Sequence, residues 1–213
     1  MKKLFLILLV FLISGCSLPS DDYIKNSLEN YFASYDHSSI KPNNRLKYFS
    51  YYLPSDVYEE SYDDDYVVMK FGDSRILMNI NVADLINVEY YKDAYPTREK
   101  FFDSSHLLYS CQGVFDDGSG GYINYSFDIY LYENDYLSSL KTDEMCFYAY
   151  GKKNDAVECS KHLLLIARSI NMDKEAIVSQ YSFKETIDYE KKQVSLFDHL
   201  IPTEGRLEDI VID

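Results

Sequence analysis

The sequence predicts an α+β fold: an antiparallel sheet of about five to six strands, with one N-terminal helix and one late helix near the C-terminus. Three observations support this prediction. Residues 22–35 and 155–170 carry apolar side chains at helical spacing. Between them, several segments alternate apolar and polar residues. Short turn-forming clusters join these segments, and strands joined by tight turns with helices outside their run are typical of α+β proteins.

The first predicted helix covers residues 22–35, and Ser20 or Asp21 can cap its N-terminus. Its apolar positions fall on one face and are Tyr23, Ile24, Leu28, Tyr31, Phe32 and Tyr35. We expect this face to pack on the core of the domain. A helix lying close to a membrane is the alternative.

Two hairpins are predicted in the middle of the chain. They pair residues 66–71 with 75–82, and residues 107–115 with 123–131. Asp116 to Gly121 forms the second turn, and the alternation places Cys111 on the inward face of this long hairpin. Residues 46–53, which end before Pro54, and residues 145–150 are further predicted strands.

The late helix covers residues 155–170, with Asn154 or Asp155 as its cap. Beyond Asp173 the pattern weakens, and Ile177 and Tyr181 are compatible with packing in a helix or a closing strand. The predicted organisation is a signal peptide at 1–15, a lipidated N-terminus with helix and loop at 16–45, an α+β domain at 46–183 and an acidic C-terminal tail at 184–213.

The N-terminus carries the one specific motif of the chain. Lys2 and Lys3 precede ten apolar residues, 4–13, which fit the apolar region of a signal peptide and are too few to span a bilayer. The run ends in Ser14, Gly15 and Cys16.

Leu12-Ile13-Ser14-Gly15-Cys16 resembles the lipobox of bacterial lipoproteins. The resemblance implies that the Cys16 thiol carries a diacylglycerol, that the chain is cut before Cys16, and that a palmitate-type lipid anchors the protein outside the cytoplasmic membrane. A second acyl chain makes such an anchor stable where one chain does not. An ordinary cleaved signal peptide, with Cys16 incidental, is the alternative.

The charge of the chain bears on its partners. The sequence has 21 basic and 35 acidic residues. Removing residues 1–15 takes away only Lys2 and Lys3, which leaves a formal charge of −16. Such a surface repels phosphate backbones, so we expect no nucleic-acid partner. It also repels anionic headgroups, so we expect contact with the membrane through the lipid on Cys16.

Cys111, Cys146 and Cys159 are the other cysteines, and an odd number outside the cytoplasm leaves at least one thiol unpaired. Three free thiols and one disulfide are both compatible with the sequence. Cys159 and His162 are three residues apart on one helix face, as a nucleophile pair would be, but no second Cys/His cluster provides further ligands.

The remaining candidates for chemistry are weaker. The acidic clusters at 63–65 and 116–117 do not fit the twelve-residue calcium loop. Gly118-Ser119-Gly120 lacks the spacing of a nucleophile elbow and is a predicted turn. We therefore expect no catalytic, cofactor-binding or metal-binding residues, and Cys16 is the one predicted site.

The body of the chain resembles PsbP-like domains over residues 46–170. The shared features are Tyr51-Tyr52-Leu53-Pro54, the long central hairpin, and a final helix ending in Arg168-Ser169-Ile170. This resemblance implies a noncatalytic accessory or binding role. The sequence thus favours a lipid-anchored binding module, with a protein or small-ligand partner. An exported hydrolase whose site forms only in three dimensions is the alternative.

Overall fold

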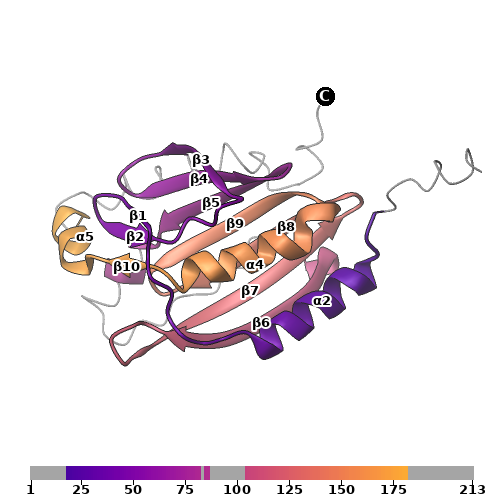
Figure 1. The fold of residues 1–213 in the computed structure, drawn as a ribbon, viewed down its shortest axis with the longest axis horizontal. Helices are drawn as coiled ribbons and strands as arrows, with labels where there is room; N and C mark the ends of the chain where they lie inside the picture. Colours follow the sequence, from indigo (N-terminus) through magenta and orange to yellow (C-terminus); the bar gives the residue numbers. More distant parts are fainter. Residues whose placement is uncertain (1–17, 83, 87–103, 182–213) are drawn as a thin grey trace, which may run out of the picture.

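The computed structural model describes residues 18–82, 84–86 and 104–181, and it confirms the α+β fold class (Figure 1). The predicted lipobox and the predicted tail at 184–213 lie outside these residues. The described helices are α2 (Asp21–Ser34), α4 (Ala156–Ala167) and α5 (Lys174–Tyr181), with two short 3-10 helices at Ser104–His106 and Lys153–Asp155.

The main sheet has seven strands, which is more than the five to six predicted. In spatial order they are β3 (Tyr58–Tyr62), β4 (Tyr66–Phe71), β5 (Ser74–Ile80), β9 (Met145–Lys152), β8 (Asp135–Thr142), β7 (Tyr122–Tyr132) and β6 (Leu107–Asp116). All neighbouring strands are antiparallel. Both predicted hairpins are present.

Two strands of this sheet were not predicted. β3 is an edge strand of mostly exposed residues, so it lacks an apolar face that could be read in the sequence. β8 lies between two other strands and is buried on both faces, where Ser138 and Ser139 take core positions. Ser138 is accommodated because its hydroxyl lies 2.8 Å from that of Ser160 on α4.

A second sheet of three strands lies beside α5 (Figure 1). Its order is β1 (Asn44–Arg45), β2 (Phe49–Tyr51) and β10 (Asn171–Met172). The strand predicted over residues 46–53 is therefore reduced to the three residues of β2. In this small sheet, β1 and β2 precede β3 in the chain, and β2 pairs with β10, which follows α4 and is distant from them in the sequence.

α2 and α4 cover the same face of the main sheet (Figure 1). Ile24, Leu28 and Phe32 of α2 are buried in the main core, and the Phe32 ring centroid lies 4.5 Å from that of Phe127 on β7. Ser20 caps α2, because its hydroxyl accepts a hydrogen bond from the Tyr23 N–H. The first helix therefore packs on the core, as we expected.

The opposite face of the main sheet carries two smaller apolar clusters, one around Leu77 and Tyr148 and the other around Tyr130 and Leu137. Leu107 packs in the second of these clusters. A register shift between Leu107 and Tyr109 turns the first residue of β6 away from the main core. The prediction that apolar residues alternate on one face from residue 107 onward is therefore wrong at Leu107.

The turn of the long hairpin is held by aspartate carboxylates. Asp117 Oδ1 accepts hydrogen bonds from the Ser119 and Gly121 N–H groups, and these bonds hold the pKa of Asp117 below its usual range. Gly118 and Gly120 have φ of +79° and +95°, a backbone region that glycine enters without strain. Cys111 pairs with Phe127 and packs against the main core, so its predicted inward orientation is confirmed.

α2 and α4 run side by side in the same direction. Near their N-termini, Lys153 Nζ lies 3.0 Å from Asp21 Oδ1. Near their C-termini, the Arg168 guanidinium donates two hydrogen bonds, of 3.0 and 2.6 Å, to the Ser38 carbonyl oxygen. We call the end that contains Asp21 and Lys153 the proximal end, and the end that contains Ser38 and Arg168 the distal end.

Candidate functional site

A hollow with convergent polar groups lies at the distal end, between the three-stranded sheet and the first turn of α5. This distal groove has a volume of about 570 Å³. The residues that line it include Arg45, Lys47, Tyr48, Ser50, Asn171 and Lys174. A volume of this size is in the range of small-ligand sites.

The floor of the distal groove is a row of three polar residues, one from each strand. In the register of the sheet, Arg45 pairs with Ser50, and Ser50 pairs with Asn171. Directly paired residues project from the same face, so a guanidinium, a hydroxyl and a carboxamide lie next to one another. Their neighbours Phe49 and Tyr51 are buried on the other face.

Two lysines, Lys47 and Lys174, also line the groove beside this row. Lys47 Nζ lies 3.0 Å from Asp64 Oδ2 and 4.6 Å from the centroid of the Tyr48 ring. Hydrogen bonding to Tyr48 and Asp64 raises the pKa of Lys47, so this ammonium stays charged at neutral pH. Lys174 Nζ lies 2.5 Å from Glu144 Oε1.

Arg45 differs from these two lysines, because among the described residues its guanidinium has no ion-pair partner within 4.0 Å. Two acids also line the groove, Asp173 and Glu175. Asp173 is engaged as a helix cap, since its Oδ1 accepts a hydrogen bond from the Ala176 N–H in α5. The groove therefore presents one guanidinium whose charge is not already matched.

The small sheet is held rigidly. The Tyr51 hydroxyl donates a hydrogen bond to the Glu59 carboxylate and accepts one from the Asn44 side chain. Burial is the main cause that raises the pKa of Tyr51, and the hydrogen bond to Glu59 raises it further. The Tyr52 N–H donates to Ser169 Oγ at 2.7 Å, which connects β2 to the end of α4. A ligand in the groove would therefore meet a preformed surface.

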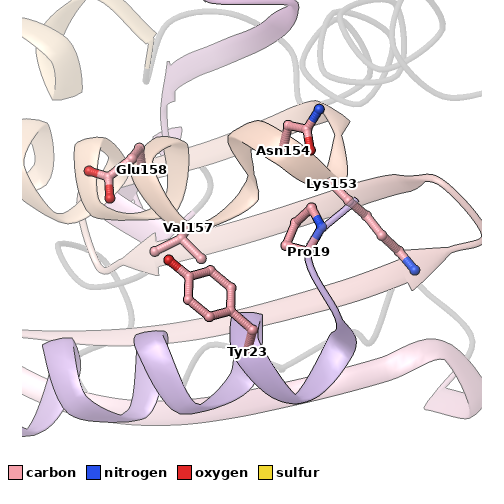
Figure 2. A pocket seen from close by; sticks show the side chains of 6 residues that line it. All are labelled: Pro19, Tyr23, Lys153, Asn154, Val157 and Glu158. Atoms are coloured by element: carbon pink, nitrogen blue, oxygen red, sulfur yellow. The ribbon is translucent and has the colours of Figure 1, made fainter. Parts of the chain in front are cut away.

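A smaller hollow of about 350 Å³ lies at the proximal end, between the first turns of α2 and α4. Figure 2 shows Tyr23 extending from α2 toward Val157 of α4, with Pro19 beside Lys153. Asn154 and Glu158 complete its lining. Its one lysine is already paired with Asp21, so this hollow has little unmatched charge to offer a ligand.

The structure does not assemble the Cys159–His162 pair. Cys159 is fully buried on the inner face of α4, while His162 lies 3.2 Å from Asp56 and packs edge-on against Phe71. Burial raises the pKa of Cys159 to about 12, so the thiol is protonated at neutral pH and is a poor nucleophile.

The other two thiols are also unsuited to reaction. Burial raises the pKa of Cys146 to about 11, and it raises the pKa of the half-buried Cys111 as well. Cys111, Cys146 and Cys159 are all free, so of the two arrangements compatible with the sequence the structure has three unpaired thiols. Their packing is that of small apolar side chains.

The acidic clusters are used within the fold. Asp64 pairs with Lys47, Asp65 accepts a hydrogen bond from the Tyr181 hydroxyl, and Asp117 holds the hairpin turn. Within residues 18–82, 84–86 and 104–181, no three His, Cys, Asp or Glu side chains are grouped as metal ligands. The predicted cap Asp155 is likewise used elsewhere: its carboxylate accepts from the Asp73 N–H and the Ser74 hydroxyl, and it makes no cap bond.

The polar row of the distal groove was not predicted. β1 and β10 have two residues each, too few to show alternation, and Ser50 and Asn171 are 121 positions apart. The sequence does not indicate that they are paired. No protein-family model matches the chain, and no curated protein matches it either. Within the part of the chain that the structure describes, no helix combines the length and apolarity needed to span a membrane.

Proposed function

We propose that this chain is a bacterial lipoprotein, anchored through a lipid on Cys16 at the outer face of the cytoplasmic membrane, that acts as a noncatalytic binding module. The lipobox residues Leu12 to Cys16 support the anchor. The anchor and the localisation rest on the sequence, because Cys16 lies outside the described residues.

The observation that carries the binding role is the Arg45–Ser50–Asn171 row on the floor of the distal groove. A guanidinium donates two parallel hydrogen bonds to a carboxylate or a phosphate, and a hydroxyl and a carboxamide can supply further donors. Since Arg45 has no acidic partner among the described residues, an anionic ligand group would meet an unmatched positive charge. The proposed ligand is a small molecule that carries a carboxylate or a phosphate.

The position of the groove also supports this role. β10 follows the C-terminus of α4, whereas the first described residues, which precede α2, lie at the proximal end (Figure 1). α4 has 12 residues and is therefore about 18 Å long. A lipid anchor at one end leaves the groove at the other end open to soluble ligands.

The geometry does not favour the exported hydrolase. In the one nucleophile pair that the sequence offered, Cys159 is fully buried with its thiol protonated, and His162 is engaged by Asp56. The resemblance to PsbP-like domains supports the same choice. Its two strings, around Tyr52 and Ser169, are in direct contact through the 2.7 Å hydrogen bond.

The anchor is tested by Cys16→Ala in cells labelled with a palmitate analogue. The unsubstituted chain is expected to carry the label and to sediment with membranes, whereas Cys16→Ala carries no label and is released from them or mislocalised within them. A Cys159→Ala variant is the matched control, since it also removes one cysteine and should keep the label. Equal labelling of Cys16→Ala would overturn the lipoprotein proposal.

The ligand class is tested by titrating the unlipidated domain with phosphate and with the dicarboxylates succinate and malate, by calorimetry and thermal shift. At least one anion should bind and raise the melting temperature. Arg45→Gln should weaken binding about tenfold or more, since a charged hydrogen bond contributes about 1.5–3 kcal/mol. Arg75→Gln is the control, because Arg75 pairs with Glu60 on the main sheet. Equal effects of both variants, or no binding to the wild-type domain, would contradict an anion site at Arg45.

A further inference from the structure

The proximal end exposes two large apolar or aromatic side chains close in sequence to Cys16. Leu18 and Tyr23 are 43% and 59% exposed, and they are two of the six large apolar or aromatic residues that the described chain leaves exposed. Both lie within seven positions of Cys16 in the sequence. Tyrosine combines an apolar ring with a polar hydroxyl, and such residues concentrate where a membrane meets water.

The distance from Cys16 to this end is limited by the chain itself. Three residue steps separate Cys16 from Pro19, so the two Cα atoms are at most about 11 Å apart. Pro19 lines the proximal hollow together with Tyr23. A lipid on Cys16 would therefore hold this end close to the headgroups.

The two charged residues that line the proximal hollow, Lys153 and Glu158, are already paired. Lys153 pairs with Asp21 at 3.0 Å, and Glu158 pairs with Lys161 at 2.6 Å. No unmatched cation of the hollow is left to seek anionic lipid, and a chain of formal charge −16 after cleavage is repelled by an anionic surface. Contact with the membrane at this end must come from Leu18 and Tyr23.

We propose that the Leu18 and Tyr23 side chains insert into the headgroup interface of the bilayer, so that the domain contacts the membrane through its proximal end. We call this contact the membrane seat. This inference rests on the proposed lipid anchor at Cys16. This membrane seat consists of one apolar and one aromatic side chain, and it contacts the interface of a neutral phospholipid bilayer. It holds the distal groove about 20 Å further from the membrane, which is the length of the 14-residue helix α2.

The absence of tryptophan from the sequence gives a direct test. Tyr23→Trp places a single reporter at the proximal end. Tyr122→Trp is the matched control, because Tyr122 is 74% exposed and pairs with Asp116, whose N–H donates to the His37 carbonyl beyond the C-terminus of α2. Both lipidated variants are reconstituted into phosphatidylcholine vesicles, with and without bromines on the acyl chains.

We expect the emission at position 23 to shift to shorter wavelength and to lose intensity with brominated lipid, while the emission at position 122 keeps its water-exposed wavelength and intensity. Leu18→Trp should behave as Tyr23→Trp and serves if that variant does not fold. Vesicle flotation separates the two proposals. A chain that floats without quenching at 18 or 23, or with equal quenching at 122, overturns the seat. A chain that does not float overturns the anchor, and the seat with it.

Discussion

At the proximal end α4 is joined to α2 by the Lys153–Asp21 ion pair, whereas at the distal end the Arg168 guanidinium donates two hydrogen bonds to the Ser38 carbonyl. The two cations are similarly buried, with Lys153 12% and Arg168 7% exposed, but the Asp21 partner of Lys153 is 58% exposed, whereas Arg168 makes two short bonds to one backbone carbonyl. An exposed pair is weakened by water and salt, and a buried charge must keep its partners. The distal end is therefore the more tightly fixed of the two, and the distal end carries the polar groove.

The largest expected effect follows from removing the distal contact. Arg168→Ala should lower the free energy of unfolding by about 3 kcal/mol, because it removes two charged hydrogen bonds to a carbonyl and the stacking of the guanidinium on Tyr35. Urea unfolding followed by circular dichroism measures the change. Lys161→Ala, which removes an exposed ion pair with Glu158 and a contact of the ammonium with the Tyr31 ring, is the control on the same helix and should cost about 1 kcal/mol or less. If both variants lower the free energy of unfolding by a similar amount, the distal contact is not the stronger one.

A second variant, Asp155→Ala, tests a less exposed contact at the proximal end. Asp155 accepts hydrogen bonds of 3.0 Å from both the Asp73 N–H and the Ser74 hydroxyl, so it attaches the β4–β5 turn to the start of α4. Asp155→Ala should lower the free energy of unfolding by about 1–2 kcal/mol. Ser74→Ala removes one of the two bonds and should cost less. If Asp155→Ala costs as much as Arg168→Ala, the proximal end is not the looser one.

The Lys153–Asp21 ion pair itself should contribute little. Lys153→Met keeps the aliphatic part of the side chain and should cost about 0.5 kcal/mol, because the Asp21 partner is mostly in water. A double-mutant cycle with Asp21→Asn isolates the pair energy, which should decrease further at high salt. A coupling energy well above 1 kcal/mol would show that the pair is better shielded than its exposure indicates.

The smallest effect is local and concerns the hairpin turn at the distal end. Hydrogen bonds from the Ser119 and Gly121 N–H groups lower the pKa of Asp117 in the folded chain, so the stabilisation is present at neutral pH and is lost as the pH falls through that lowered value. Amide exchange at Ser119 and Gly121, corrected for its intrinsic pH dependence, should therefore become faster below about pH 4. In Asp117→Asn this change should disappear; if it persists, another group titrates.

The sequence was sufficient for the elements whose residues alternate strongly. α2 and the long hairpin were predicted because each has one buried face and one solvent face, so Leu28 and Phe127 are found at regular spacing from other apolar residues. β8 was missed for the opposite reason. Both of its faces are buried, and its Ser138 hydroxyl is satisfied by Ser160 of α4, a contact that no local pattern reveals.

The candidate site was less predictable than the fold. Cys159 and His162 are close in the chain, but the sequence offers no further group to complete a site with them, and the fold places them in different environments. The Arg45–Ser50–Asn171 row consists of common surface residues, and only the pairing of three short strands brings them together. Proximity in the sequence therefore does not indicate which polar side chains meet in the groove.

The two contacts that fix α2 also set the order in which the chain can fold. They join residues 132 and 130 positions apart, so the first helix cannot complete its docking until the segment around Arg168 is available. Contacts of such high sequence separation slow folding, because a long loop must close before they form. If the chain is exported and lipidated as proposed, the segment after the signal peptide crosses the membrane first. Attachment of the lipid at Cys16 would then precede closure of the domain, and the chain would fold while already tethered to the membrane.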